Sequence, residues 1–493
     1  MAAFPQRAAP EGRIVMNIVD RPICFGVIVG TRGFFNPALA SEGRKRLLGV
    51  LDAMGFPSII PEEKSTPNGA IETLADAKKC AAMFQANRAK IDGIIVSLPN
   101  FGDELGVVQT LDLARLDVPL LVHAFDDDID KVDVAHRRDA FCGKLSVCNN
   151  LHQYGIPWTD TTEHSCAVDG AQLKKDVERF ARVCRVVRGL RGARIGAIGT
   201  RPAAFQTMRY SEKLLQASRI TVVPVDLSEM LAAAGKIREN AREVQEKLAT
   251  IKGYGKIPSR ITAESILMQA KLSVAIDRWM AENECVASAI QCWDSVQRNW
   301  GCATCLSMSL MGEIERKPSA CEVDVTGAVS MLALTLASGN AVGFLDWNNN
   351  YGTDREKCVS THCSNFPKSF INGEIEISEL DVLGEHLGRE RCFGAIKGKV
   401  KAGPMTFFRV DTDDTCGSVR GYLGEGEFTD DPFDMDGGIA VCKIKGLRKL
   451  LGYICENGFE HHVAMVRSHC ADALFEATTK YLKWGMHWHG KEN

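Results

Sequence analysis

Short apolar runs alternate with longer helical segments over the first 350 residues of the chain. The runs at 24–30, 93–99 and 118–125 are rich in branched residues and are closed by glycine or polar residues, which predicts buried strands. Strands that alternate with helices predict a parallel sheet with helices on both faces. The loops that follow these strands, at 31–36, 100–104 and 126–130, are then the expected ligand-binding edge.

The same alternation resumes after an amphipathic helical segment at 169–192, and it continues to an apolar strand at 341–347. From about residue 395 the pattern changes to short β-rich runs punctuated by glycine and aspartate. We therefore predict an α/β protein with two doubly wound units, at 1–165 and 166–350. A β-rich, antiparallel, barrel-like domain at 351–493 follows them.

The composition is that of an ordinary folded protein, with 45% hydrophobic and 25% charged residues. A net charge of −3 and the lack of an apolar stretch near ~20 residues predict neither a nucleic-acid nor a membrane partner. The 18 cysteines are spread through apolar runs, which favours buried, reduced thiols in a cytoplasmic protein. The CxxC motif at 302–305 has no second pair, so we interpret it as core packing rather than as a zinc or redox site.

Two acids lie on either side of one predicted helix. Glu322 precedes a predicted amphipathic helix at 324–338, and Asp346 ends the apolar strand that follows it. A helix, turn and strand of this length bring Asp346 back toward the level of Glu322, so the two carboxylates face each other. Paired carboxylates share a divalent cation or shift each other's pKa for proton transfer. The alternative interpretation of Glu322 is an acid-rich helix start, which the helix dipole favours.

A histidine pair, His461 and His462, follows a turn and begins another apolar strand. Adjacent residues of a strand point to opposite faces, so only one of the pair enters a given site. Two carboxylates and one imidazole form a mixed oxygen and nitrogen shell, which suits Mn²⁺ better than zinc or calcium. His362, on the loop after Asp346, is a further candidate.

Polar and aromatic side chains at the strand ends are candidates for contacts with a substrate. Carboxamides both donate to and accept from hydroxyl groups, an indole face suits the C–H face of a sugar ring, and loop arginines suit an anionic or polyhydroxy molecule. On this basis we predict substrate contacts from Arg32, Gln291, Trp293, Trp347 and Asn348, with Arg201 as a second loop arginine.

Five segments taken together resemble the L-fucose isomerase / L-arabinose isomerase family, in its fucose-type branch: CEVDVTGAVSMLAL, FLDWNNNYG, HCSNFP, GEGEFTDDPFDMDGG and ENGFEHHVAMV. The resemblance covers essentially the whole chain, including the order of two α/β units and a β-rich domain. It implies that Glu322, Asp346 and His462 bind a catalytic Mn²⁺ or a related divalent cation. It also implies that His362 and His461 lie near the substrate.

The resemblance implies a metal-dependent aldose–ketose isomerase that acts on a free sugar through an ene-diol. Glu322 and Asp346 are then both metal ligands and the acid–base pair. Arg32 and Arg201 extend the expected substrates to deoxy-sugars or sulfosugars such as sulfoquinovose. The family also implies a homo-oligomer, a trimer or hexamer, in which the N-terminal unit of a neighbouring subunit completes the site.

A non-catalytic sugar-binding or sensor protein built on the same α/β cleft is the alternative function. Paired α/β units also form the clefts of binding proteins. A sensor has no need for two acids and a histidine that converge on a metal, so the metal content of the purified protein distinguishes the two functions.

Overall fold

The computed structural model describes residues 18–363, 365–435 and 437–491. The chain forms two compact units. The N-terminal unit consists of Arg21–Arg188 with Asp472–Lys483, and the larger unit consists, within the described residues, of 18–20, Gly189–Ala471 and 484–491. The predicted domain boundaries at residues 165 and 350 stay predictions. No helix in the described part of the chain is both long enough and apolar enough to cross a membrane.

The N-terminal unit contains the predicted parallel sheet, with the strand order β2-β1-β3-β4-β5. Its three central strands are buried along their whole length, because helices cover a parallel sheet on both faces. The strands are β1 (Phe25–Val29), β2 (Ser58–Ile59), β3 (Gly93–Leu98), β4 (Leu120–Ala124) and β5 (Thr159–Asp160). The helices are α1 (Pro37–Ala53), α2 (Leu74–Ala86), α3 (Glu104–Ala114), α4 (Ala140–Gln153), α5 (Ala171–Leu190), α15 (Ala471–Glu476) and the π-helical turn Ala477–Tyr481.

The larger unit begins with a second parallel sheet, in the order β7-β6-β8-β9. Its strands are β6 (Arg194–Ile198), β7 (Thr221–Val225), β8 (Ala287–Ile290) and β9 (Ser319–Ala320). Its helices are α6 (Glu212–Ala217), α7 (Leu227–Lys236), α8 (Arg242–Tyr254), α9 (Ala263–Glu282), α10 (Ser295–Asn299), α11 (Cys305–Ile314) and α12 (Val325–Ser338). The two parallel sheets followed by a β-rich part confirm the predicted fold class.

The β-rich part is a ten-stranded, mainly antiparallel sheet with the path β10-β18-β15-β16-β17-β12-β11, to which β13, β14 and β19 are added. Within the described residues its end strands β10 and β11 do not pair with each other, so the sheet is not a closed barrel. The strands are β10 (Gly343–Asp346), β11 (Asn349–Tyr351), β12 (Asp354–His362), β13 (Glu376–Glu379), β14 (Phe393–Lys399), β15 (Gly403–Asp413), β16 (Ser418–Thr429), β17 (Gly438–Lys443), β18 (His462–Val466) and β19 (Gly485–Trp488). The helices are α13 (Asp381–Leu387) and α14 (Leu447–Glu456), with 3₁₀ turns at Pro67–Gly69, Gln206–Met208, Lys368–Phe370 and Arg389–Arg391.

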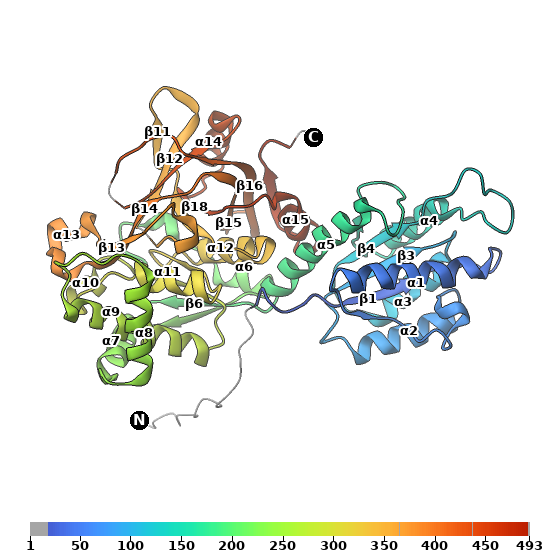
Figure 1. Ribbon diagram of the computed structural model, residues 1–493, viewed down its shortest axis with the longest axis horizontal. Helices are drawn as coiled ribbons and strands as arrows, with labels where there is room; N and C mark the ends of the chain where they lie inside the picture. Colours follow the sequence, from blue (N-terminus) through green and yellow to red (C-terminus); the bar gives the residue numbers. More distant parts are fainter. Residues whose placement is uncertain (1–17, 364, 436, 492–493) are drawn as a thin grey trace. The chain divides into compact units, whose positions relative to one another are not determined.

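Helix α12 differs from its sequence-based prediction, which was an amphipathic helix. Every residue from Val325 to Ala337 is buried, because α12 packs on β8 and β9 of the parallel sheet and on β15 and β18 of the antiparallel sheet (Figure 1). A helix enclosed on both sides is apolar all round. The strand that follows it was expected to end the α/β part, yet β10 pairs antiparallel with β18. The turn before α12 and the end of β10 are therefore brought to the same place.

Candidate active site

Asp346 and His462 face each other across two antiparallel strands. Asp346 is the last residue of β10, His462 is the first of β18, and the register pairs them directly. Directly paired residues of antiparallel strands place their side chains on the same face of the sheet. Asp346 Oδ1 accordingly lies 3.6 Å from His462 Nε2. His462 is buried, whereas His461 next to it is exposed, although the two rings lie close together, with centroids 4.5 Å apart.

Glu322 reaches the same point from the other sheet. It follows β9, at the carboxyl edge of the parallel strands, where ligand sites of such sheets lie. Glu322 and Val323 both have left-handed backbone angles, with φ of 52° and 56°. Such angles are unfavourable for a β-branched residue and are found most often where a site demands them. The turn directs the Glu322 side chain inward, and Glu322 Oε2 lies 3.4 Å from His462 Nε2.

His362 completes the cluster from the end of β12. Its Nδ1 lies 3.0 Å from Asp346 Oδ1, and its Nε2 lies 3.4 Å from Glu322 Oε2. The His362 and His462 rings meet edge to face, with centroids 4.9 Å apart, and both pack against the ring of Phe344. Phe344 in turn approaches Gly327 so closely that a Cβ at that position would lie 2.6 Å from its ring. Glycine at position 327 therefore allows the ring of Phe344, on which both imidazoles pack, to lie against α12.

The donor set fits a divalent cation. Glu322 Oε2 is buried and accepts no hydrogen bond from any described residue, although two imidazole nitrogens lie near it. The ligand atoms of Glu322, His362 and His462 lie within 4.8 Å of one another, as do those of Asp346, His461 and His462. Two carboxylates and imidazole nitrogen match the preferences of Mn²⁺ and related ions. The residues present therefore suit the kind of metal that the sequence predicts.

A buried ion-pair network holds His462 from behind. His462 Nδ1 lies 2.9 Å from Asp324 Oδ2. Arg409, which is fully buried, donates to both oxygens of Asp324 at 2.6 and 3.0 Å, and it also pairs with Glu460 at 2.7 Å. Burial alone would raise the pKa of Asp324, but Arg409 and His462 outweigh it and hold that pKa well below its usual range. Asp324 is therefore a carboxylate that fixes the orientation of the imidazole.

The environment moves the pKa values of the two candidate acids in opposite directions. Burial raises the pKa of Glu322, although the neighbouring His362 and His462 act in the opposite direction. Burial also acts to raise the pKa of Asp346, but His362 and His462 outweigh it, so that this pKa is lowered. Pairs of acids whose pKa values are shifted in opposite directions are typical of sites that move protons.

Sequence reasoning missed several neighbours of the acids. Cys292 and Cys363 donate from their thiols to Glu322 Oε1, at 3.2 and 3.5 Å. In the sequence these cysteines resemble any other small core residue. An acidic partner of Arg409 could have been predicted, because a lone arginine inside the apolar strand FFRV is almost never buried without one.

Gln291 and Trp293 lie at the end of β8, close to Glu322. Trp293 Nε1 donates to Cys363 Sγ at 3.2 Å, which places the indole one contact away from the Glu322 carboxylate. Gln291 Oε1 accepts from the backbone N–H of Thr200 at 2.9 Å. Gln291 also lines a pocket of about 640 Å³ at the ends of β6, β7 and β8. Their roles in binding a substrate stay predictions.

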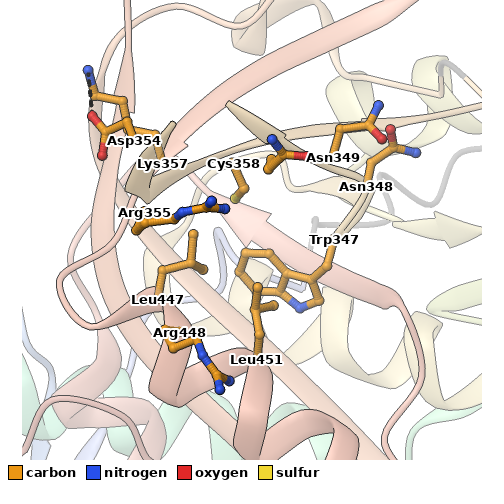
Figure 2. A pocket seen from close by; sticks show the side chains of 11 residues that line it. Trp347, Asn348, Asn349, Asp354, Arg355, Lys357, Cys358, Leu447, Arg448 and Leu451 are labelled. Carbon is orange, nitrogen blue, oxygen red and sulfur yellow. Dashed lines mark ion pairs between the residues drawn. The ribbon is translucent and has the colours of Figure 1, made fainter. Parts of the chain in front are cut away.

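Trp347 and Asn348 line a different pocket, of about 480 Å³, between the β11–β12 hairpin and α14. Figure 2 shows the indole of Trp347 beside Leu451, with Asn348 and Asn349 at the rim. Trp347 Nε1 donates to the hydroxyl of Tyr422 at 2.9 Å. Because neighbouring residues of an extended chain point to opposite faces, this indole is directed away from the Asp346 carboxylate. The assignment of Trp347 and Asn348 to the substrate stays a prediction.

Arg32 belongs to the N-terminal unit, on the loop after β1. Its guanidinium forms an ion pair with Glu104, lies 3.8 Å from Asp103 and stacks over the ring of Phe101 at 4.2 Å. This matches the pairing expected of an ordinary loop arginine. It does not test whether Arg32 contacts a substrate.

Two segments of the chain match known sequence families. Residues 26–191 match the family described as the N-terminal domain of fucose/sulfoquinovose isomerase, and residues 360–489 match the C-terminal domain of L-fucose isomerase. His362 and His462 lie within the second match, whereas Glu322 and Asp346 lie between the two.

Curated relatives extend across the region between these matches. Sulfoquinovose isomerase of Alkalicoccus urumqiensis is 26% identical over 402 residues, which cover 81% of this chain and 86% of the relative. Sulfoquinovose isomerase of Priestia megaterium is 24% identical over 390 residues, which cover 78% and 83%. A protein with the same description from Priestia aryabhattai matches equally well. The chain contains both terminal domains of one family, and the relatives cover the region between them, where Glu322 and Asp346 lie. The chain therefore belongs to the L-fucose isomerase family of aldose–ketose isomerases.

Proposed function

We propose that this isomerase is Mn²⁺-dependent and that its substrate is a sulfonated sugar such as sulfoquinovose. Glu322, Asp346 and His462 are the proposed metal ligands. The observation that carries the metal dependence is the position of Glu322 Oε2, which is buried, accepts no hydrogen bond within the described residues and lies 3.4 Å from His462 Nε2. A buried carboxylate oxygen left in this state is costly unless a cation neutralises it.

Aldose–ketose isomerisation moves one proton between two carbons and another between two oxygens. One carboxylate of the pair Glu322 and Asp346 removes the proton from the carbon next to the carbonyl, and the other moves the proton between the oxygens. Acid–base catalysis of this kind contributes ~10²–10⁴-fold for each group. The divalent cation, when bound, supplies a Lewis acid for the negative charge that develops on the sugar oxygens. The Asp324 carboxylate holds His462 in place throughout.

The sulfonated substrate is supported by the descriptions of the relatives and by one arginine. Arg201 follows β6, and its Nη1 donates to the backbone carbonyls of Pro202 and Ala203 at 3.1 and 3.3 Å. It forms no ion pair with a carboxylate in the part of the chain described. Phe205, on the same loop, packs edge to face on Trp293, with ring centroids 5.7 Å apart. The loop therefore extends toward the Glu322 side of the site and offers a cation for a sulfonate.

The metal dependence is tested by removing metal with EDTA, verifying its loss by elemental analysis and then adding back Mn²⁺. We expect ketose formation to stop without metal and to return with Mn²⁺. Full activity in a verified metal-free preparation would contradict the proposal. A protein that binds sugar but forms no ketose under any metal condition would instead be the non-catalytic sensor considered above.

The sulfonate recognition is tested with sulfoquinovose and with quinovose, the same sugar without its sulfonate. Charge-assisted hydrogen bonds contribute ~1.5–3 kcal/mol. Arg201→Gln is therefore expected to raise KM for sulfoquinovose by ~10–100-fold and to leave KM for quinovose within a factor of ~2. Equal losses for both sugars would remove Arg201 from sulfonate recognition.

A further inference from the structure

Three thiols surround the side of Glu322 that faces away from the imidazoles. Cys292 follows β8, Cys321 follows β9 and Cys363 follows β12. Their sulfur atoms and one oxygen of Glu322 all lie within 4.8 Å of one another. Cys292 and Cys321 are fully buried, and Cys363 is half-buried. The cluster thus lies in the interior of the unit, with Cys363 as its least buried member.

The two oxygens of Glu322 face chemically different surroundings. Oε2 lies 3.4 Å from the Nε2 atoms of His362 and His462. Oε1 instead accepts from Cys292 Sγ at 3.2 Å and from Cys363 Sγ at 3.5 Å. One carboxylate therefore borders a set of hard oxygen and nitrogen ligands and a set of soft sulfur ligands. Soft thiolates select zinc-like cations, whereas carboxylates and imidazole with open positions accept Mn²⁺.

The dimensions of the cluster suit a tetrahedral site after a small contraction. A zinc–sulfur bond of ~2.3 Å in a tetrahedron separates the sulfur atoms by about 3.8 Å. The four ligand atoms already lie within 4.8 Å, so the largest contraction is about 1 Å. Three thiolates and one carboxylate carry the same formal charge as the four thiolates of common structural zinc sites.

We propose that Cys292, Cys321 and Cys363, with Glu322 Oε1, form a site for a thiophilic divalent cation such as Zn²⁺ or Cd²⁺, and that filling it stops turnover. The thiols that bind the cation give up their protons to the solvent, and no electron is transferred. The bound cation draws the Glu322 carboxylate toward the sulfur atoms. Glu322 is then withdrawn from the acid–base pair.

The competing interpretation is that the thiols only pack and donate hydrogen bonds to Glu322. Both interpretations make Cys292 and Cys363 important for the position of Glu322, so activity alone does not separate them. Cadmium binding does, because cadmium bound to thiolates absorbs in the ultraviolet through sulfur-to-metal charge transfer. The band reports the number of thiolates whether or not the protein turns over a sugar, so its result is independent of the proposed function.

The experiment is a Cd²⁺ titration of the full-length protein in excess Mn²⁺, with the charge-transfer absorption and the proton release followed together. We expect one saturating equivalent of Cd²⁺, an intensity typical of three thiolates, release of protons to the solvent and loss of isomerase activity in parallel with the band. Excess Mn²⁺ is expected not to remove the band. A band that is absent, or that Mn²⁺ displaces, would overturn the proposal.

Cys321→Ser removes one sulfur ligand and neither of the two thiols that contact Glu322. We expect it to weaken Cd²⁺ binding by ~100-fold or more, since losing only the hydrogen-bond partner of a ligand costs about 10–100-fold. Cys285→Ser is the matched control, because Cys285 is also buried and its thiol donates to a backbone carbonyl, that of Asn283. If Cys321→Ser does not fold, the half-buried Cys363→Ser replaces it. A band that survives both serine variants of the cluster would overturn the proposal.

Discussion

His462 Nδ1 and Asp324 Oδ2 lie 2.9 Å apart, although the two residues are 138 positions apart in the sequence. A carboxylate only accepts, so Nδ1 carries a proton, and in the neutral imidazole that a metal ligand requires Nε2 keeps its lone pair. That lone pair faces Glu322 Oε2 and Asp346 Oδ1. Arg409 binds the far side of Asp324 and keeps it ionised. The tautomer that a metal ligand requires is thus built into the protein.

Asp324→Asn tests this arrangement. The amide can turn its N–H₂ group toward His462, which favours the tautomer with the proton on Nε2 and opposes metal binding. We expect Mn²⁺ to bind about 10–100-fold more weakly, measured by calorimetric titration of the folded apoprotein. Asp411→Asn is the control, because Asp411 lies on the same strand as Arg409 and contacts Thr412 and Arg420. Unchanged Mn²⁺ affinity in Asp324→Asn would show that the hydrogen bond does not set the tautomer.

Glu322→Gln and Asp346→Asn remove the two proposed acid–base groups with little change in volume. We expect each substitution to lower kcat by ~10³-fold or more, because each acid is assigned both to proton transfer and to the metal. Circular dichroism and the unfolding temperature are expected to show an intact fold. Near-normal kcat in either variant would mean that the acid concerned had been misassigned.

Asp411 makes the stability of the protein depend on pH. Burial raises the pKa of Asp411 to about 7, and the nearby Glu460 acts in the same direction. The folded protein therefore binds this proton more tightly than the unfolded chain, whose aspartates titrate near ~3.9. The resulting stability is complete below that value and is lost as the pH rises toward 7. Asp411→Asn is expected to stabilise the protein by ~1–3 kcal/mol at pH 8 and to change little at pH 4, as measured by urea unfolding. A gain of equal size at both pH values would contradict the titration as its cause.

Part of this site was accessible from the sequence because its signals are local. The change from exposed His461 to buried His462 is the alternation expected where a strand begins, and the helix between Glu322 and Asp346 has a length that returns the chain. The fold class was confirmed for the same reason, since strand and helix patterns are local. The pairing of β10 with β18 was not predicted, because the residues of a strand do not show which other strand it pairs with. The contacts of Cys292 and Cys363 with Glu322 depend on three loops that meet only in the folded chain.

The N-terminal unit carries apolar side chains that a folded subunit leaves in water. Phe34, on the loop after β1, is 90% exposed, and Ile129 and Val134, on the loop after β4, are 86% and 80% exposed. Large apolar side chains gathered at one edge of a sheet are typical of a surface that another molecule covers. These exposed side chains support a homo-oligomer. We expect the trimer or hexamer that the resemblance implies, in which this edge and Arg32 approach the site of a neighbouring subunit.

Mixing two inactive variants tests this arrangement. A Glu322→Gln subunit lacks the acid of its own site, and an Arg32→Ala subunit lacks the arginine that would enter the site of its neighbour. After subunit exchange at equal amounts, one site in four combines an intact Glu322 with an intact Arg32 from the neighbour, so we expect about a quarter of the wild-type activity. Exchange is verified by mass spectrometry of subunits labelled with heavy isotopes. If exchanged mixtures stay inactive, Arg32 either acts in the site of its own subunit or takes no part in the reaction. An active monomer in light scattering would exclude a shared site.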